Sequence, residues 1–250
     1  ITTTLKGYCS YNKTNITSNN NSGWDEDIKN ANKDFIESGN FNGCINLKDF
    51  FGFCEDYKRI LINCNQQLIL NRASLDINAV KQYKNNEVVA DAPKLKTSWE
   101  LCEYPFVPQN ISHSWKVKTS NKLEKPRYVI IGFQTNRKNS SNKTISHFDH
   151  CKIKNLKMAT LYRAYVEFQK SYYGHDEVIP LLNRSDFNNL CLIIVVDIGK
   201  QNDNVKMSTV DLRIELEADE AFPVSTSAFC LILHDHIITY NSFNEEAGTL

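Results

Sequence analysis

Apolar and polar positions in the second half of the chain follow the period of β-strands. Residues 127–135 (RYVIIGFQT) form a nearly continuous apolar run, which is typical of a strand covered on both faces. Residues 210–218 alternate apolar and charged side chains without an error, which predicts a strand with one face in a core and the other in water. Apolar runs at 191–198 and 228–240 predict two further strands. Several strands joined by short loops indicate an antiparallel sandwich or barrel.

Two shorter segments complete the predicted strands, and one helix interrupts them. Residues 98–108 are extended and end at two prolines, and residues 147–158 alternate with one slip. From 159 to 173 the apolar side chains instead recur at helical spacing on a single stripe, and Gly174 supplies the end of the helix. The stripe consists of Leu161, Tyr165, Phe168 and Tyr172.

The first half of the chain is less regular. Residues 1–40 are rich in Asn, Ser, Thr and Lys and have few periodic apolar positions, which predicts a flexible arm or loop. A more apolar texture begins at residue 41, with a short helical turn at 47–53 and a run with β propensity at 60–70. Residues 76–91 are polar and break this pattern, so we expect a domain boundary there.

The charge balance argues against nucleic acid as a partner. Lysine plus arginine and aspartate plus glutamate number 29 each, whereas a dedicated nucleic-acid binder needs clustered positive charge. No signal peptide is visible, and no apolar run reaches the roughly 20 residues that cross a bilayer. We therefore expect an intracellular protein that does not span a membrane.

The eight cysteines are widely spread and form no CxxC pair, so they predict free thiols that serve as small apolar core residues. They are Cys9, Cys44, Cys54, Cys64, Cys102, Cys151, Cys191 and Cys230. The alternative is a secreted β-sandwich binding module with paired cysteines. Glycosylation sequons at Asn12, Asn110 and Asn142 suit that alternative, although asparagine is abundant enough to produce such triplets by chance.

One constellation resembles an enzyme site. His147 and Asp149, together with His234 or His236, could form the two-histidine, one-carboxylate triad that holds iron in a cupin-like oxygenase. Oxygenases of that type usually also have a basic residue after the distal histidine, and none lies between His236 and Leu250. The competing interpretation is that these histidines make ordinary hydrogen bonds.

Other catalytic signatures are missing from the sequence. No phosphate-binding glycine loop, no G-x-S-x-G elbow and no zinc-ligand spacing is present. The preferred interpretation is therefore a protein that is not an enzyme and has no catalytic, cofactor-binding or metal-binding residues. The iron-dependent oxygenase is kept as the alternative.

Several segments resemble the double jelly-roll major capsid proteins of viruses. Residues 45–70, with the aromatic core FGFC, resemble the end of the first jelly roll. Residues 115–139 resemble the opening strand pair of the second roll, and residues 146–158 resemble its next strand. Residues 161–174 resemble a helix that these proteins carry on an extended loop, and residues 190–203 and 210–240 resemble the closing strands.

The resemblance is closest to capsid-like proteins encoded in animal genomes by polinton-like or adintovirus-like elements. It implies an all-β fold of antiparallel jelly-roll sandwiches, of the double jelly-roll type but with an incomplete first roll. The domains would be an arm at 1–40, a remnant of the first roll at 41–91 and the second roll at 92–250, which carries the helix 159–173. It further implies a structural role in a virion shell or in an endogenous viral relic. The expected partners are two further copies in a homotrimer and the neighbouring capsid subunits.

Overall fold

The computed structural model describes residues 1–14, 44–50, 54, 67, 69, 80–82, 88–90, 99–119, 126–137, 140, 143–144, 146–154, 157–174, 179–199, 212–234, 238–241 and 246–249. The helices are α1 (Thr2–Ser10), α5 (Leu47–Phe50), α7 (Met158–Tyr173) and α8 (Arg184–Asn189). The strands are β1 (Val80–Gln82), β2 (Val88–Ala90), β3 (Glu100–Tyr104), β4 (Ser112–Lys116), β5 (Pro126–Thr135), β6 (Ile193–Asp197), β7 (Arg213–Glu217), β8 (Thr226–His234), β9 (Ile238–Asn241) and β10 (Glu246–Thr249).

The central strands pair in a nested order. Strand β3 pairs with β8, β4 with β7 and β5 with β6, and each pair is antiparallel. Strand β8 also pairs with β5, so one sheet has the order β3-β8-β5-β6 and the other consists of β4 and β7. A long antiparallel hairpin that is rolled up into two sheets produces this nesting, which is the topology of a jelly roll. The predicted all-β jelly-roll sandwich is confirmed.

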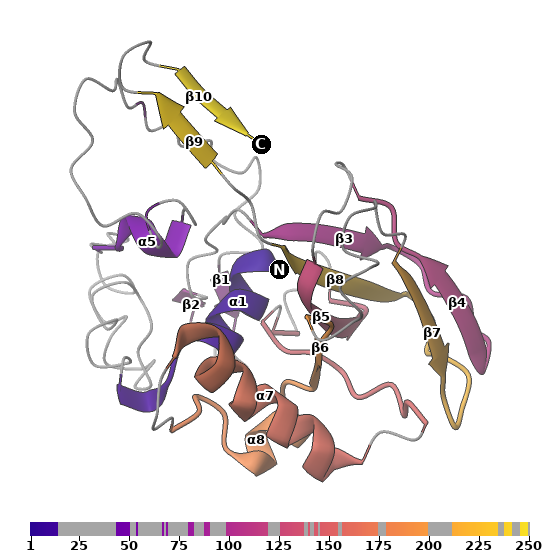
Figure 1. Ribbon diagram of the computed structural model, residues 1–250. Helices are drawn as coiled ribbons and strands as arrows, with labels where there is room; N and C mark the ends of the chain where they lie inside the picture. Colours follow the sequence, from indigo (N-terminus) through magenta and orange to yellow (C-terminus); the bar gives the residue numbers. More distant parts are fainter. Residues whose placement is uncertain are drawn as a thin grey trace.

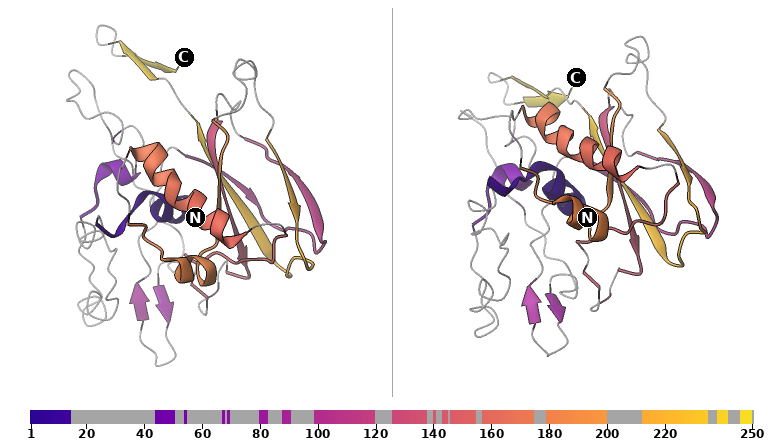
Figure 2. Two further views of the ribbon diagram at one scale, coloured as in Figure 1. Left: turned by 60° about the horizontal axis from the view of Figure 1, so that its bottom comes forward. Right: turned by 90° about the horizontal axis from the view of Figure 1, so that it is seen from below.

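Strand β5 lies in the middle layer of three. Figure 2 shows helices α1 and α7 on one side of the four-stranded sheet and the pair β4–β7 on the other. The Tyr128 ring meets Phe168 of α7 at a centroid distance of 4.8 Å, whereas Phe133 points to the opposite face and meets Phe222 at 5.7 Å. The apolar run at 127–135 therefore belongs to a strand that is covered on both faces, as its sequence predicts.

Helix α7 confirms the prediction made from the apolar stripe. Leu161, Tyr165 and Phe168 are buried against the sheet, and α7 packs mainly on β6. The helix ends at Gly174, whose φ of 68° is the left-handed conformation that glycine adopts without strain.

Helix α1 corrects the prediction of a flexible arm for residues 2–10. Leu5 and Cys9 are fully buried, and the Tyr165 hydroxyl of α7 donates a 2.9 Å hydrogen bond to the carbonyl of Tyr8. Lys6 is also buried and places its ammonium 5.2 Å from the centre of the Trp99 ring. Contacts with distant residues therefore make this helix, which the polar local pattern could not reveal. Residues 15–40 lie outside the part of the chain that the structure describes.

Two predicted strands differ from those in the structure. Instead of a strand at 147–158, isolated bridges join Phe148 to Cys191 and Ile153 to Ala218. Cys151 and Lys152 have φ values of 47° and 46°, so the chain turns between these bridges. The single strand predicted at 228–240 is divided into β8 and β9, and β9 pairs with β10 in a separate hairpin (Figure 1).

The first half of the chain is described only in parts. Helix α5 agrees with the helical turn predicted at 47–53, whereas the run at 60–70 lies largely outside the described residues. The polar stretch at 76–91, predicted as a boundary, contains the hairpin of β1 and β2. The division into domains at residues 40 and 91 stays a prediction. Among the helices that the structure describes, none is long and apolar enough to cross a membrane.

Candidate functional site

The carboxylate of Asp149 forms an ion pair and hydrogen bonds at the carboxyl end of β5. It accepts hydrogen bonds from the backbone N–H of Thr135 at 2.7 Å and from Arg137 Nε at 3.3 Å and Nη2 at 2.5 Å. Arg137 also donates to the carbonyl of Thr144 at 2.9 Å. Both carboxylate oxygens therefore hold the chain around the end of β5, which is a structural use of the His-x-Asp segment.

The structure separates His234 from the other two members of the predicted triad, His147 and Asp149. His147 lies in the loop before the bridge at Phe148, where its carbonyl accepts a hydrogen bond from Gln134. His234 pairs with Pro126 at the opposite end of β5 from Thr135, which binds Asp149. Nine residue steps along a strand span roughly 30 Å, too far for Asp149 and His234 to share one ion. His236 lies outside the described residues.

Within the ranges that the structure describes, no group of three histidine, cysteine, aspartate or glutamate side chains could hold a metal ion. This finding does not test a site that includes His236. The preferred interpretation of a chain without catalytic, cofactor-binding or metal-binding residues therefore stays a prediction.

Of the seven cysteines that the structure describes, four belong to the hydrophobic core, as predicted, whereas Cys44 is exposed and Cys54 and Cys151 are half-buried. Cys9, Cys102, Cys191 and Cys230 are free and buried. Burial raises the pKa of the Cys102 thiol to about 11, and the charge of Glu100 adds to the effect. A thiol with a raised pKa stays protonated at neutral pH and is a poor nucleophile, so Cys102 fits a packing role.

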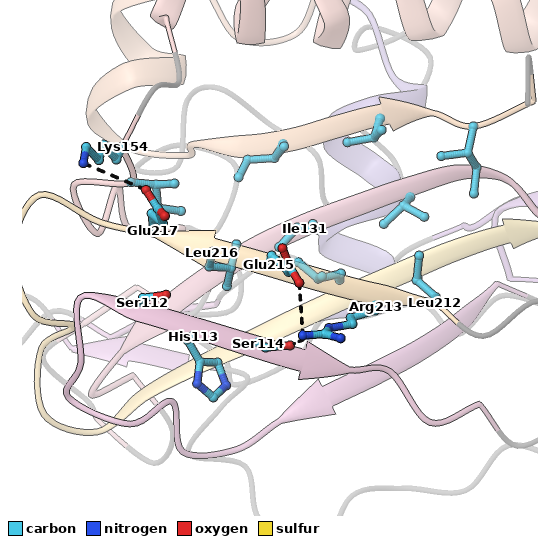
Figure 3. A pocket seen from close by; sticks show the side chains of 16 residues that line it. Ser112, His113, Ser114, Ile131, Lys154, Leu212, Arg213, Glu215, Leu216 and Glu217 are labelled. Carbon is cyan, nitrogen blue, oxygen red and sulfur yellow. Dashed lines mark hydrogen bonds and ion pairs between the residues drawn. The ribbon is translucent and has the colours of Figure 1, made fainter.

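A cavity of about 750 Å³ lies between the two sheets and is lined by β4, β5, β6, β7 and the bridge at Ile153. Its aliphatic lining consists of Val129, Ile131, Ile153, Ile194, Val196, Ile198, Leu212, Ile214 and Leu216. Figure 3 shows these apolar side chains between the strands. Among the strands that the structure describes, β6 and β7 stand at the edges of their sheets, so in this part of the chain the cavity lies at an open side of the sandwich.

The charges at the rim of this cavity are paired with one another. Arg213 Nη2 lies 3.1 Å from Glu215 Oε1, and Lys154 Nζ lies 3.9 Å from Glu217 Oε2 (Figure 3). Arg213 Nε also donates to Ser114 Oγ at 2.9 Å. All four charged side chains are more than half exposed, so each pair contributes at most about 1 kcal/mol. The arrangement provides an apolar surface whose rim charges balance one another.

A second surface lies at the end of the sandwich formed by the β3–β4 and β7–β8 loops. Three large apolar side chains are exposed there: Phe106 by 75%, Ile111 by 56% and Val224 by 63%. The two loops are joined because the Val107 N–H donates to the Thr226 carbonyl at 2.8 Å. Exposed apolar side chains in two adjoining loops form a candidate interaction surface.

Sequence reasoning missed both surfaces. The cavity depends on which strands stand at the sheet edges, and no local pattern encodes that property. Phe106 carried a usable signal, because it lies between Pro105 and Pro108 in a segment that cannot continue a strand. A phenylalanine in such a turn either covers the core or projects into solvent. The side chain of Phe106 projects into solvent.

Comparison with known protein families identifies a match. The family model of the double jelly roll-like domain matches residues 1–97, 94–160 and 157–238, so nearly the whole chain is covered. No curated protein and no solved structure matches the chain.

Proposed function

The chain belongs to the double jelly roll-like domain family, and on that basis we propose that it is a structural capsid-type protein that assembles with further copies of itself. The observation that supports the proposal is the nested strand pairing β3·β8, β4·β7 and β5·β6. The family model matches almost the whole chain in which this pairing occurs. Sandwiches of this kind are stiff, and shells are built by repeating one stiff unit through symmetry.

The surfaces of the sandwich support this role better than a catalytic one. The end that carries Phe106, Ile111 and Val224 offers apolar area to a neighbouring copy, and such area is unfavourable in water until it is covered. The ionic groups described above, by contrast, are used within the chain, as Asp149 is by Arg137. The protein is accordingly proposed to be a building block without enzymatic activity.

The finer parts of the proposal concern the assembly and its origin. The copies form a homotrimer, and the trimers contact neighbouring capsid subunits. The protein acts inside cells or within a virion, either as a working shell protein or as a relic of a polinton-like element in a host genome. Membranes and specific nucleic-acid sequences are not among its partners.

The test uses the full chain at increasing concentration. Light scattering coupled to size-exclusion chromatography measures the mass of the species in solution, and electron microscopy detects particles. We expect a trimer that associates further into regular assemblies. A species that is strictly monomeric and never assembles would contradict the proposal.

A further inference from the structure

The outer edge of β7 presents backbone groups that point away from β4. The Leu212 carbonyl accepts a 2.9 Å hydrogen bond from the Val117 N–H that follows β4, so Leu212 faces that strand. Successive residues of a strand alternate the direction of their backbone groups, so Arg213 and Glu215 face the other way. Glu217 confirms the alternation, because its carbonyl accepts a 2.7 Å hydrogen bond from Lys154 on the outer side.

Only one end of this edge is covered by described residues. The backbone N–H of Lys154 donates to the Glu217 carbonyl, and the Asp219 N–H donates to the Lys152 carbonyl at 2.9 Å. Within the ranges that the structure describes, no backbone group pairs with the outer edge of residues 212–216. An open strand edge is a template for pairing with another chain.

We propose that the open part of this edge pairs with β7 of another copy. The two strands run antiparallel about a two-fold axis at Ile214. In this register Arg213 lies opposite Glu215 of the second copy, and Glu215 lies opposite Arg213 of the second copy. Both are the outward-facing residues, so each such pair exchanges both N–H···O bonds. The two β4–β7 sheets become one continuous sheet across the axis.

Charge complementarity selects the register. Opposite charges directly across a strand pair stabilise it, whereas like charges destabilise it. The register about Ile214 places both arginines opposite glutamates. A shift that centres the axis on Glu215 would place the two Glu215 carboxylates opposite each other, and it would require the Glu217 carbonyl that Lys154 already occupies.

The other face of the strand fits the same register. Ile214 lies opposite Ile214 of the second copy, and Leu212 lies opposite Leu216, so only aliphatic side chains meet on the side of the cavity. The segment at Lys152–Lys154 limits the pairing to residues 212–216 in both copies. The contact is therefore short and weak by itself, and it gains strength where many copies are repeated in one assembly.

The experiment measures the dissociation constant of this pairing by analytical ultracentrifugation of the full chain. The charge reversals Arg213→Glu and Glu215→Arg each place like charges opposite one another at both pairs. We expect each to raise the dissociation constant by roughly tenfold or more. The double variant R213E/E215R restores opposite charges and is expected to return to within a few-fold of the original constant.

The matched control is Arg163→Glu on α7. Arg163 and Glu167 form an exposed pair within one element, as Arg213 and Glu215 do, but they lie away from the edge. This control is expected to leave the dissociation constant unchanged. If Arg213→Glu does not fold, as judged by circular dichroism, Glu215→Arg tests the same two charge pairs across the axis.

Three outcomes overturn the inference: no association of the unmodified chain up to its solubility limit, no weakening by either single reversal, or no recovery in the double variant. The inference rests on the strand edge and not on the proposed function. Particles that are insensitive to all these variants would overturn the edge contact alone. A charge-dependent dimer that never forms trimers or particles would overturn the capsid role alone.

Discussion

The guanidinium of Arg137 and the carboxylate of Asp149 form a two-point ion pair at the end of β5. Their side chains are 12% and 29% exposed, so the pair is shielded from water far better than the surface pair of Lys152 and Glu220. The backbone N–H of Thr135 donates to the same carboxylate. Asp149 therefore connects the end of the central strand to the loop that follows it.

Asp149→Asn is expected to lower the free energy of unfolding by about 1–3 kcal/mol, because it removes charge-assisted hydrogen bonds and leaves Arg137 with little solvation. Chemical denaturation with urea measures the change. The control is Glu220→Gln, which removes a pair whose side chains are 60% and 65% exposed and is expected to cost less than about 1 kcal/mol. Equal losses in the two variants would contradict the assigned role of Asp149.

The sequence predicted the strands of the jelly-roll sandwich well because these strands obey a local rule. The alternation at β7 and the unbroken apolar run of β5 each report how many faces of the strand are covered. Helix α7 was predicted for the same reason, since its stripe and its terminal Gly174 are both local signals. Such features require no knowledge of the neighbouring elements.

The features that sequence reasoning missed depend on distant partners. Helix α1 is defined by its packing on α7 and by Lys6 over Trp99, which lies more than ninety positions away in the chain. The turn at Cys151 and Lys152 needs backbone conformations that non-glycine residues seldom adopt. The separation of Asp149 from His234 follows from the register of β5 and β8, which no motif encodes.

Gly132 is a position on β5 that is expected to tolerate no larger residue. A Cβ atom there would lie 2.5 Å from the Phe148 ring, well inside van der Waals contact. Gly132→Ala is therefore expected to lower the free energy of unfolding by about 1–3 kcal/mol, measured by urea denaturation. The usual gain of up to about 1 kcal/mol from a less flexible unfolded chain is smaller than this cost.

The control for this prediction is Gly199→Ala, where the nearest atom is the Asp197 carboxylate end at 3.2 Å and can move. It is expected to change stability by less than about 0.5 kcal/mol. Adding Phe148→Leu to Gly132→Ala should recover part of the loss if the ring causes it. A Gly132→Ala protein as stable as the original would show that β5 and Phe148 are not packed as described.

The buried thiol of Cys102 predicts a loss of stability at alkaline pH. Burial, followed by the charge of Glu100, raises the pKa of this thiol from 9.0 to about 11. Above pH 9 the unfolded chain releases the proton before the folded chain does, so this contribution to stability is complete below pH 9 and is lost between pH 9 and 11. By pH 10 the loss is on the order of 1 kcal/mol.

The measurement is the free energy of unfolding from pH 7 to 11 for the original chain and for Cys102→Ala. The other buried thiols are present in both proteins, so the difference between the two curves reports Cys102 together with its effect on the neighbouring Cys230. We expect the stability advantage of the original chain to be constant below pH 9 and to shrink above it. A difference that stays constant to pH 11 would mean that Cys102 is accessible to water.

Phe106 gives the most direct test of the exposed loop surface. Its side chain is 75% exposed, so Phe106→Ser is expected to change the free energy of unfolding by less than about 0.5 kcal/mol. The same change removes the largest apolar group that this end offers to a neighbouring copy, so association measured by light scattering is expected to weaken by about tenfold or more. Ile179→Ser is the control, because Ile179 is 61% exposed and lies next to Pro180, which bridges to Asn12 after helix α1. Equal association of the original chain and the Phe106 variant would exclude this end as an assembly surface, whereas weakening by the Ile179 variant as well would point to a general effect of surface hydrophobicity.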